Sequence, residues 1–260
     1  TSVVSIARID EMTKEITTTP IWLNQMLYDG AIMRSEKIPT VIAWYNQQLL
    51  VGKGAADLKY HLTKDVNVWY SFKMELGEDY GVKYPASELN QNSGFPILNP
   101  KDAVKVFFRY LKDQIDRYVK TNNFPSNIRY AVSIPASFEA NQRKELIEAL
   151  EQNGISLNNQ SLIDEPNAAF LSYVVYSSSE RNPIILPDGD NPKVLVFDFG
   201  AGTCDISILE LGKDLNGIYS KNLSISKFEK LGGDDIDKLI AIEYLFPQLL
   251  QENGKTIEDF

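Results

Sequence analysis

Hydrophobic and polar residues follow two kinds of pattern along this chain. Residues 194–197 and 206–211 are short, mostly apolar runs, which predict β-strands, and the first run is typical of a buried strand. Across residues 102–118, apolar side chains recur every three or four positions and share one face, which predicts an amphipathic helix. Strands and helices of this kind alternate along the chain, a pattern typical of an α/β protein.

Other segments repeat these two patterns. Extended segments are expected over residues 16–24, 38–45, 49–51, 128–134, 162–163 and 223–228, with a turn at residues 46–48. Helices are expected over residues 139–152, from about Pro166, and from Asp234 onward. Residues 177–191 contain prolines and a glycine and predict a linker, and hence a boundary near residue 190.

The turn within residues 194–211 has the chemistry of a phosphate site. Gly200 and Gly202 lack the Cβ atoms that would keep the backbone away from a ligand. Successive backbone N–H groups in such a turn form a concavity that binds anions. Asp198 and Asp205 flank the turn, where a carboxylate can hold water on Mg²⁺. The segment therefore predicts a phosphate-binding hairpin.

A weak internal repeat links this hairpin to the start of the sequence. Residues 1–9 align with residues 203–211 without a gap. Both segments begin with threonine and a small residue, have serine and isoleucine at the fifth and sixth positions, and have aliphatic residues at the fourth and ninth positions. The repeat indicates two related lobes, each with a phosphate hairpin, the first lacking its leading strand and acid-glycine turn. The alternative is that two strands share the residues that strands favour.

Composition narrows the class of protein. A chain of 260 residues can bury one large core or two modest ones. A net charge of −9 argues against a protein that wraps a nucleic-acid backbone. Cys204 is the single cysteine, so no internal disulfide forms, and a reducing compartment such as the cytoplasm is expected. The sequence shows no signal-peptide pattern and no apolar run long enough to cross a membrane, so no membrane partner is expected.

Four motifs occur in order along the chain. They are Ile-Pro-Ala-Ser-Phe from residue 134, Asp-Glu-Pro-Asn-Ala-Ala from residue 164, Asp-Phe-Gly-Ala-Gly-Thr from residue 198 and Gly-Gly-Asp-Asp from residue 232. Their order and spacing resemble the nucleotide-binding domain of the DnaK-like, seventy-kilodalton heat-shock chaperones. Residues 38–44, residues 50–55 and the Phe72-Lys73 pair fall where that family has similar segments.

The resemblance implies a fold and its ligands. The expected fold is an actin-like ATPase (ribonuclease H-like) fold of the α/β class, in which two lobes would surround a cleft that holds ATP or ADP and Mg²⁺. Residues 1–190 would form lobe I, with an inserted subdomain at about residues 38–100. Residues 191–260 would begin an incomplete lobe II.

The resemblance also implies roles for individual residues. Asp198 would hold Mg²⁺-bound water or the attacking water, and Glu165 would be a second acid that reaches the metal through water. Lys73 would reach the γ-phosphate, and Asp205 would belong to the water network. Donors to the phosphates would come from Gly200, Ala201, Gly202 and Thr203, and Gly232 and Gly233 would bring backbone close to the nucleotide.

These residue types also have ordinary structural roles. A turn acid such as Asp198 can cap local N–H groups, and Glu165 can be a first-turn acid favoured by the helix dipole. Asp205 can end a hairpin, Lys73 can be a solvated side chain, and the Gly232-Gly233 pair can be a helix entry turn.

The function that the resemblance implies is that of a chaperone ATPase domain. Hydrolysis would be coupled to client polypeptides held by a C-terminal domain outside this sequence, with a J-domain co-chaperone and a nucleotide-exchange factor as further partners. Ser161 stands where the family commonly has an arginine that docks J-domains. One alternative is an actin-like filament-forming ATPase, which does not typically carry Ile-Pro-Ala-Ser-Phe. Another is a sugar or acetate kinase, which needs a substrate-binding lobe that the sequence does not show.

The sequence departs from the family pattern in several places. Ala201 replaces the middle glycine of the turn, and Lys73 is followed by Met-Glu-Leu-Gly instead of a basic-aliphatic run. The first acid-glycine-threonine loop and a later adenosine-binding segment are not in the sequence. We therefore expect residues 1–260 by themselves to hydrolyse ATP weakly or not at all.

Overall fold

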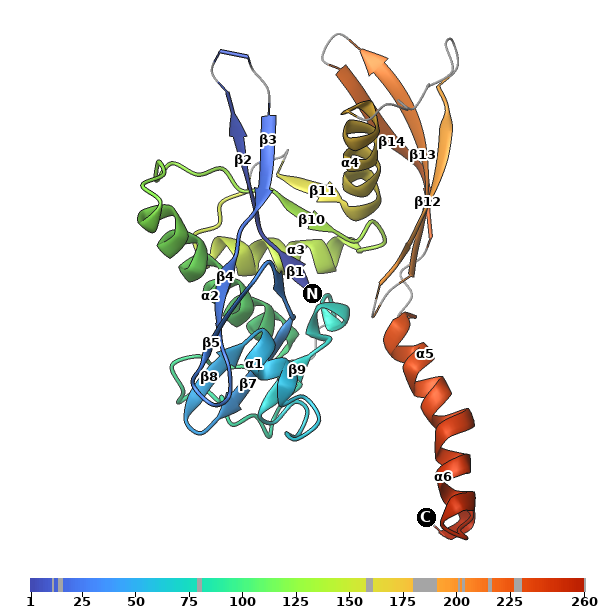
Figure 1. The fold of residues 1–260 in the computed structure, drawn as a ribbon. Coiled ribbons are helices and arrows are strands. Elements are labelled where there is room, and N and C mark those ends of the chain that lie inside the picture. Colours follow the sequence, from blue (N-terminus) through green and yellow to red (C-terminus); the bar gives the residue numbers. More distant parts are fainter. Residues whose placement is uncertain are drawn as a thin grey trace. The chain divides into compact units, whose positions relative to one another are not determined.

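The structure is a computed structural model that describes most of the chain (Figure 1). The described residues are 1–10, 12–13, 16–78, 81–157, 161–179, 191–200, 202, 204–214, 217–226 and 231–259. The chain divides into two compact units. Unit 1 comprises Thr1–Tyr130 and Ala140–Leu157, and unit 2 comprises Ala131–Glu139 and Asn158–Phe260.

Unit 1 contains small antiparallel sheets. Its strands are β1 (Ser2–Val3), β2 (Ser5–Ile9), β3 (Ile16–Pro20), β4 (Leu23–Met26), β5 (Ile32–Ser35), β6 (Lys37–Ile38), β7 (Val41–Tyr45), β8 (Gln48–Val51) and β9 (Val68–Tyr70). β1 pairs with β6, β2 with β3 and β4 with β5, while β7 lies between β8 and β9. Asn46 and Gln47 both have positive φ and form a two-residue hairpin turn between β7 and β8, one residue shorter than the turn expected at residues 46–48 because Gln48 begins β8.

The helices of unit 1 include the long amphipathic one expected from the sequence. They are α1 (Lys53–Asp57), the 3₁₀-helix η1 (Phe72–Glu75), α2 (Pro100–Thr121) and α3 (Ala140–Glu151). The side chain of Asn99 accepts a hydrogen bond from the Asp102 amide and caps α2, and Pro100 occupies its first turn. Val104, Phe107 and Leu111 are buried, as the helical spacing predicted.

Unit 2 combines a parallel pair of strands with an antiparallel sheet. β10 (Val132–Ile134) pairs parallel with β11 (Leu162–Asp164), and α4 (Glu165–Ser179) follows β11 directly. β12 (Lys193–Phe199), β13 (Cys204–Asp214) and β14 (Gly217–Ile225) form the antiparallel sheet. α5 (Gly233–Ile240), the π-helix η2 (Ala241–Leu245), α6 (Phe246–Glu252) and the 3₁₀-helix η3 (Ile257–Asp259) complete the unit.

The antiparallel sheet of unit 2 is covered by α4 on one face. Phe170 and Val174 of α4 form a buried cluster with Leu209 and Leu211 of β13. The adjacent strand β12 was expected to be buried, and it is a strand, but Leu195 on its other face is 63% exposed. The expectation of full burial was wrong because successive strand residues face opposite sides and α4 covers one side only.

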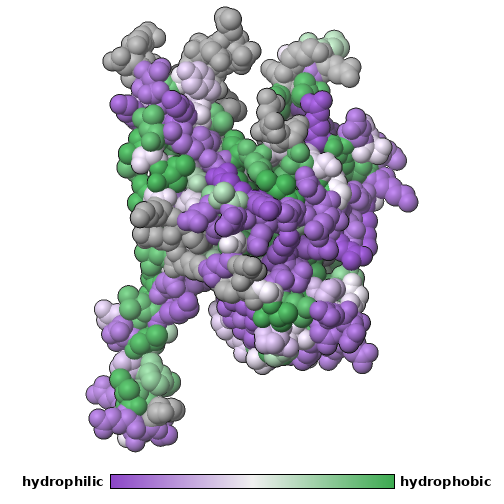
Figure 2. Space-filling view, turned by 180° about the vertical axis from the view of Figure 1, so that it is seen from behind, coloured by the Kyte–Doolittle hydropathy of each residue, from purple (hydrophilic) through white to green (hydrophobic). Residues whose placement is uncertain are grey.

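The helical stretch from α5 to α6 also presents large apolar side chains to solvent. Among them are Leu239, Ile242, Tyr244, Leu245 and Leu249. Figure 2 shows hydrophobic and hydrophilic residues intermingled along this stretch. Among the helices of the described residues, none combines the length and apolar character that crossing a membrane requires.

Several expected boundaries change in the structure. The strand expected over residues 128–134 is formed only at β10, from Val132. Ser177–Ser179, assigned to a linker from the sequence, continue α4 because the chain keeps its helical hydrogen bonds to Ser179. Residues 180–190 of that linker lie outside the described residues, so the lobe boundary near residue 190 stays a prediction. The mixed α/β class is confirmed, and the two-lobe cleft stays a prediction.

Candidate functional site

The β12–β13 hairpin places two acids side by side. Asp198 and Asp205 are paired directly across the two strands. Residues opposite each other in an antiparallel pair share one face, with Cβ atoms about 5 Å apart. By the two-residue strand period, this is the face that also carries Leu209 and Leu211, against which α4 packs. Asp205 is only 1% exposed, so a carboxylate is held inside the unit beside a more accessible one.

The loop after β10 contacts the buried acid. The backbone amide of Ser137 donates a hydrogen bond to Oδ1 of Asp205 at 3.4 Å. Within the described part of the chain, the hydroxyl oxygens of Ser137 and Ser207 are buried without a hydrogen-bond partner. Ser207 lies two residues from Asp205 on the same face of β13, and the Ser137 hydroxyl belongs to the residue whose amide binds the acid. Buried hydroxyls beside a carboxylate suit ordered water or a hydrated cation.

The first turn of α4 is fastened to the sheet by polar side chains. Asn222 of β14 donates to Asp164 at 2.8 Å, and Asn167 donates to Ser220 at 2.9 Å. These bonds fix the start of α4, where Glu165 is the first residue. A carboxylate is favoured there by the helix dipole. β10 and β11 are parallel, so Ser137 and Glu165 both follow the carboxyl ends of their strands, the edge at which α/β sheets bind ligands.

The two glycine motifs meet in unit 2. The amide of Gly233, at the start of α5, donates to the carbonyl of Gly200 at 3.0 Å. The amide of Gly232, the residue before α5, donates to Oδ2 of Asp235 at 3.0 Å. This hydrogen bond joins the hairpin turn to the N-terminus of α5, the end of a helix that favours anions.

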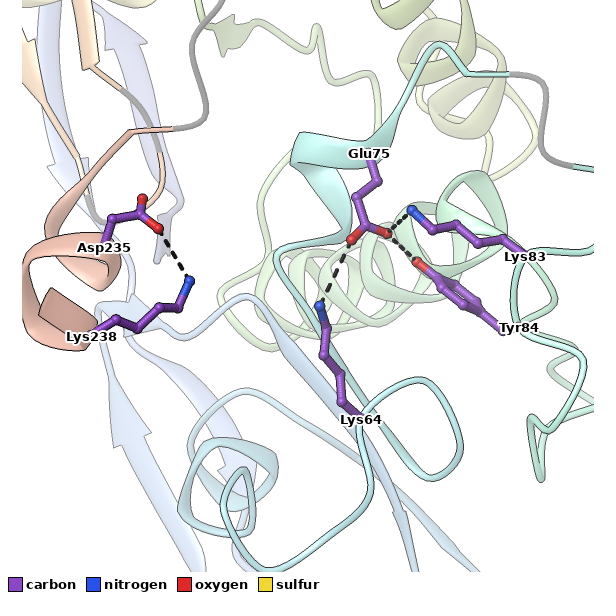
Figure 3. A network of polar contacts seen from close by, with 6 residues as sticks. All are labelled: Lys64, Glu75, Lys83, Tyr84, Asp235 and Lys238. Atoms are coloured by element: carbon purple, nitrogen blue, oxygen red, sulfur yellow. Dashed lines mark hydrogen bonds and ion pairs between the residues drawn. The ribbon is translucent and has the colours of Figure 1, made fainter. Parts of the chain in front are cut away.

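Asp235, which was not among the residues expected at the site, also holds the start of α5 in place. Lys238 lies 3.1 Å from its carboxylate (Figure 3). The hydrogen bond from Lys238, and then that from Gly232, lower the pKa of Asp235 below its ordinary value. The sequence does contain a signal for Asp235. It is an acid three positions after Gly232, the residue that precedes α5, and an acid at this spacing often stabilises the start of a helix.

The structure brings some predicted site residues together and leaves others untested. Unit 2 unites Asp198, Asp205, Gly200 and Gly233, with Glu165 at the start of the helix that covers the same sheet face. Gly202 lies in the hairpin turn and Gly232 precedes α5, whereas Ala201 and Thr203 lie outside the described residues. Lys73 belongs to unit 1, in η1, and its approach to the phosphates stays a prediction.

The Asp198–Asp205 pair is a donor set that a hydrated Mg²⁺ can use. Among the described residues, no three His, Cys, Asp or Glu side chains gather into a metal-binding group. Mg²⁺ commonly keeps several waters and uses only one or two carboxylates. The Asp198–Asp205 pair and the neighbouring hydroxyls are compatible with that mode of binding.

A comparison with known protein families gives one further finding. The family described as Hsp70 protein matches residues 33–259, which is most of the chain and includes all four sequence motifs.

Proposed function

This chain belongs to the Hsp70 protein family, and on that basis we propose that its nucleotide site lies at the β12–β13 hairpin of unit 2. Domains of the family bind ATP or ADP, and family membership implies a chaperone ATPase region in the intact protein. Client and co-chaperone partners follow from the family in general terms.

The observation that carries the proposal is the joining of the acid pair and the glycine motifs in one unit. Asp198 and Asp205 face each other across the hairpin, and Gly233 is hydrogen-bonded to Gly200 in the turn between them. Phosphates need close backbone approach, and a metal-bound phosphate needs nearby carboxylates. These features support the proposal, because glycines leave room for the backbone to approach a phosphate and the acid pair supplies carboxylates.

Each acid then has a proposed role. Asp198, the more accessible one, orients water at the terminal phosphate or at the metal. Asp205, held by the Ser137 amide, fixes the neighbouring water molecules, and Glu165 contributes negative charge from the start of α4. Mg²⁺, when bound, supplies positive charge that offsets the charge on the phosphates. Because phosphoryl transfer depends on positioning and electrostatics, none of these roles requires a covalent step on the protein.

The remaining parts of the proposal concern unit 1 and the partners. Lys73 reaches toward the terminal phosphate and orients the attacking water. Hydrolysis is coupled to client polypeptides bound by a further domain, and a J-domain co-chaperone and an exchange factor regulate the cycle. The match to the Hsp70 family supports these assignments over a filament-forming ATPase or a small-molecule kinase.

A substitution of Asp198 tests the site. Asp198→Asn in the full-length protein keeps the shape of the side chain but removes its charge. We expect the single-turnover rate of ATP hydrolysis to fall at least tenfold, which corresponds to about 1.4 kcal/mol in the barrier.

The matched control is Glu210→Gln. Glu210 lies on the same strand as Asp205 but on the opposite face, next to Lys193 of β12. This control should retain the wild-type rate. An unchanged rate in Asp198→Asn, with ATP bound, would remove Asp198 from the catalytic site.

A further inference from the structure

The helix that carries Lys73 also carries a carboxylate with three partners. Glu75 is two residues after Lys73 in η1. Its Oε2 lies 2.8 Å from Nζ of Lys83 and accepts a hydrogen bond from the hydroxyl of Tyr84 at 2.9 Å. Its Oε1 lies 3.8 Å from Nζ of Lys64 (Figure 3). One side chain of η1 is therefore tied to two other segments of unit 1.

These contacts are sheltered from water. The side chain of Glu75 is 16% exposed, and Tyr84 is 2% exposed. The amides of Lys83 and Tyr84 both donate to the carbonyl of Leu98, so the backbone that presents these partners is itself fixed. Charge-assisted hydrogen bonds are stronger than neutral ones, especially where solvent is partly excluded.

Burial raises the pKa of Glu75, but the hydrogen bonds from Lys83 and Tyr84 outweigh this effect and hold the pKa below its ordinary value. Asp65 also faces this cluster, and burial raises its pKa. At neutral pH the Glu75 carboxylate is therefore ionised and keeps its charged partners.

The residues on either side of η1 are anchored as well. Phe72 is buried, and its ring lies 6.3 Å from that of Phe107 in α2. The amide of Gly77 donates to Oε2 of Glu145 in α3 at 2.8 Å. Gly77 has φ +85°, and a Cβ there would lie 2.6 Å from Gln142. A 3₁₀-helix of four residues has little stability of its own, so these contacts determine where η1 lies.

We propose that Glu75 is a positioning residue that fixes η1 and thereby directs the side chain of Lys73. The inference rests on the proposed role of Lys73 in ATP hydrolysis. It concerns a feature particular to this chain, since Glu75 belongs to the Met-Glu-Leu-Gly run that replaces the basic-aliphatic run of the family pattern. A long flexible lysine acts well only if its backbone is fixed, because a displacement of about 1 Å at a catalytic group can cost about 100-fold in rate.

A double-mutant cycle on the full-length protein tests this role. Single-turnover hydrolysis is measured for the wild type, Glu75→Gln, Lys73→Ala and the double variant. We expect Glu75→Gln to lower the rate about fivefold when Lys73 is present and to have no effect when Lys73 is alanine. ATP affinity should be unchanged in Glu75→Gln, because the proposed defect is in orientation.

Two further variants make the test specific. Tyr84→Phe removes one bond to Glu75 and should reproduce a smaller rate loss that also disappears in the Lys73→Ala background; it replaces Glu75→Gln if that variant does not fold. Glu88→Gln is the control. It removes the charge of an exposed acid that accepts a hydrogen bond from Asn67, and it should leave the rate of hydrolysis unchanged.

The outcomes separate the two proposals. If Lys73→Ala hydrolyses ATP at the wild-type rate, the assigned role of Lys73 is wrong and the positioning role falls with it. If Lys73→Ala is slow but Glu75→Gln loses the same factor in both backgrounds, Glu75 stabilises the fold only and the positioning role is overturned. An unchanged rate in Glu75→Gln overturns it too.

Discussion

Asp205 and Glu75 are carboxylates that the fold shelters from solvent, but their surroundings differ. Glu75 is surrounded by donors that compensate its charge, two lysines and a tyrosine hydroxyl. Asp205 receives a long hydrogen bond from the Ser137 amide, and among the described residues the nearby Ser137 and Ser207 have buried hydroxyls without a hydrogen-bond partner. A fully compensated acid serves structure, whereas an acid bordered by unpaired polar atoms is suited to a ligand.

The environment of Glu75 predicts a pH-dependent stability. A folded-state pKa below the ordinary value of 4.5 means that Glu75 stabilises the protein above about pH 4.5 and loses this effect as pH falls through the folded-state pKa. We expect Glu75→Gln to lower the free energy of unfolding by about 1–2 kcal/mol at pH 7. The difference from wild type should shrink below pH 4.5 in urea titrations. A difference that stays constant down to pH 3 would contradict the assignment.

At the scale of elements, a buried glutamine joins β4 to the start of α1. Gln25 is 0% exposed; its Oε1 accepts from the Lys53 amide at 2.8 Å, and its Nε2 donates to the Lys37 carbonyl at 3.1 Å. Gly52 lies directly before α1 with φ +87°, and a Cβ there would lie 2.3 Å from Oε1 of Gln25. The close approach of two segments thus depends on a glycine.

Two glycine substitutions separate backbone strain from steric conflict. Gly52→Ala should destabilise the protein by more than Gly30→Ala, since Gly30 has a similar φ of +85° but nothing within 4 Å of an added Cβ. The cost at Gly30 is expected to be about 1–2 kcal/mol, from the left-handed conformation alone. The comparison uses free energies of unfolding from urea titration. Equal costs would show that Gln25 moves aside without loss.

At the scale of the whole molecule, the family assignment predicts stabilisation by nucleotide. A ligand that binds only the folded state raises the free energy of unfolding, by about 2.7 kcal/mol when its concentration is 100 times its dissociation constant. The melting temperature of the full-length protein should therefore rise on addition of ATP with Mg²⁺. Mg²⁺ alone is the control and should have a much smaller effect. No change at millimolar ATP would contradict a nucleotide site in the folded protein.

The sequence predicted local elements better than burial or boundaries. The spacing in α2 and the turn at Asn46 and Gln47 were recognisable because both depend on neighbouring residues. The exposed face of β12 could not be recognised, because a run of apolar residues is the same sequence pattern whether one face of the strand is covered or both are. The extension of α4 to Ser179 was not predicted because serine by itself favours turns, whereas in the structure the helix that begins at Glu165 continues through these serines.

At the candidate site, too, the residue types could be predicted from the sequence, but their contacts could not. Asp198, Asp205 and the glycines were found from the composition of two turns, and the family from the order of four motifs. Their contacts were not predictable. The hydrogen bond from Gly233 to Gly200, and that from Ser137 to Asp205, join residues far apart in the chain.

The sequence by itself thus determined where the long helix α2 and the β12–β13 hairpin form, because periodicity and turn chemistry are local properties, and the order of its motifs indicated the family. Only the tertiary structure decided that Asp205 is buried beside Ser137 and that Glu75 is bonded to Lys83 and Tyr84. Such partners are selected by the packing of distant segments, where shape and the cost of leaving polar groups unpaired act together.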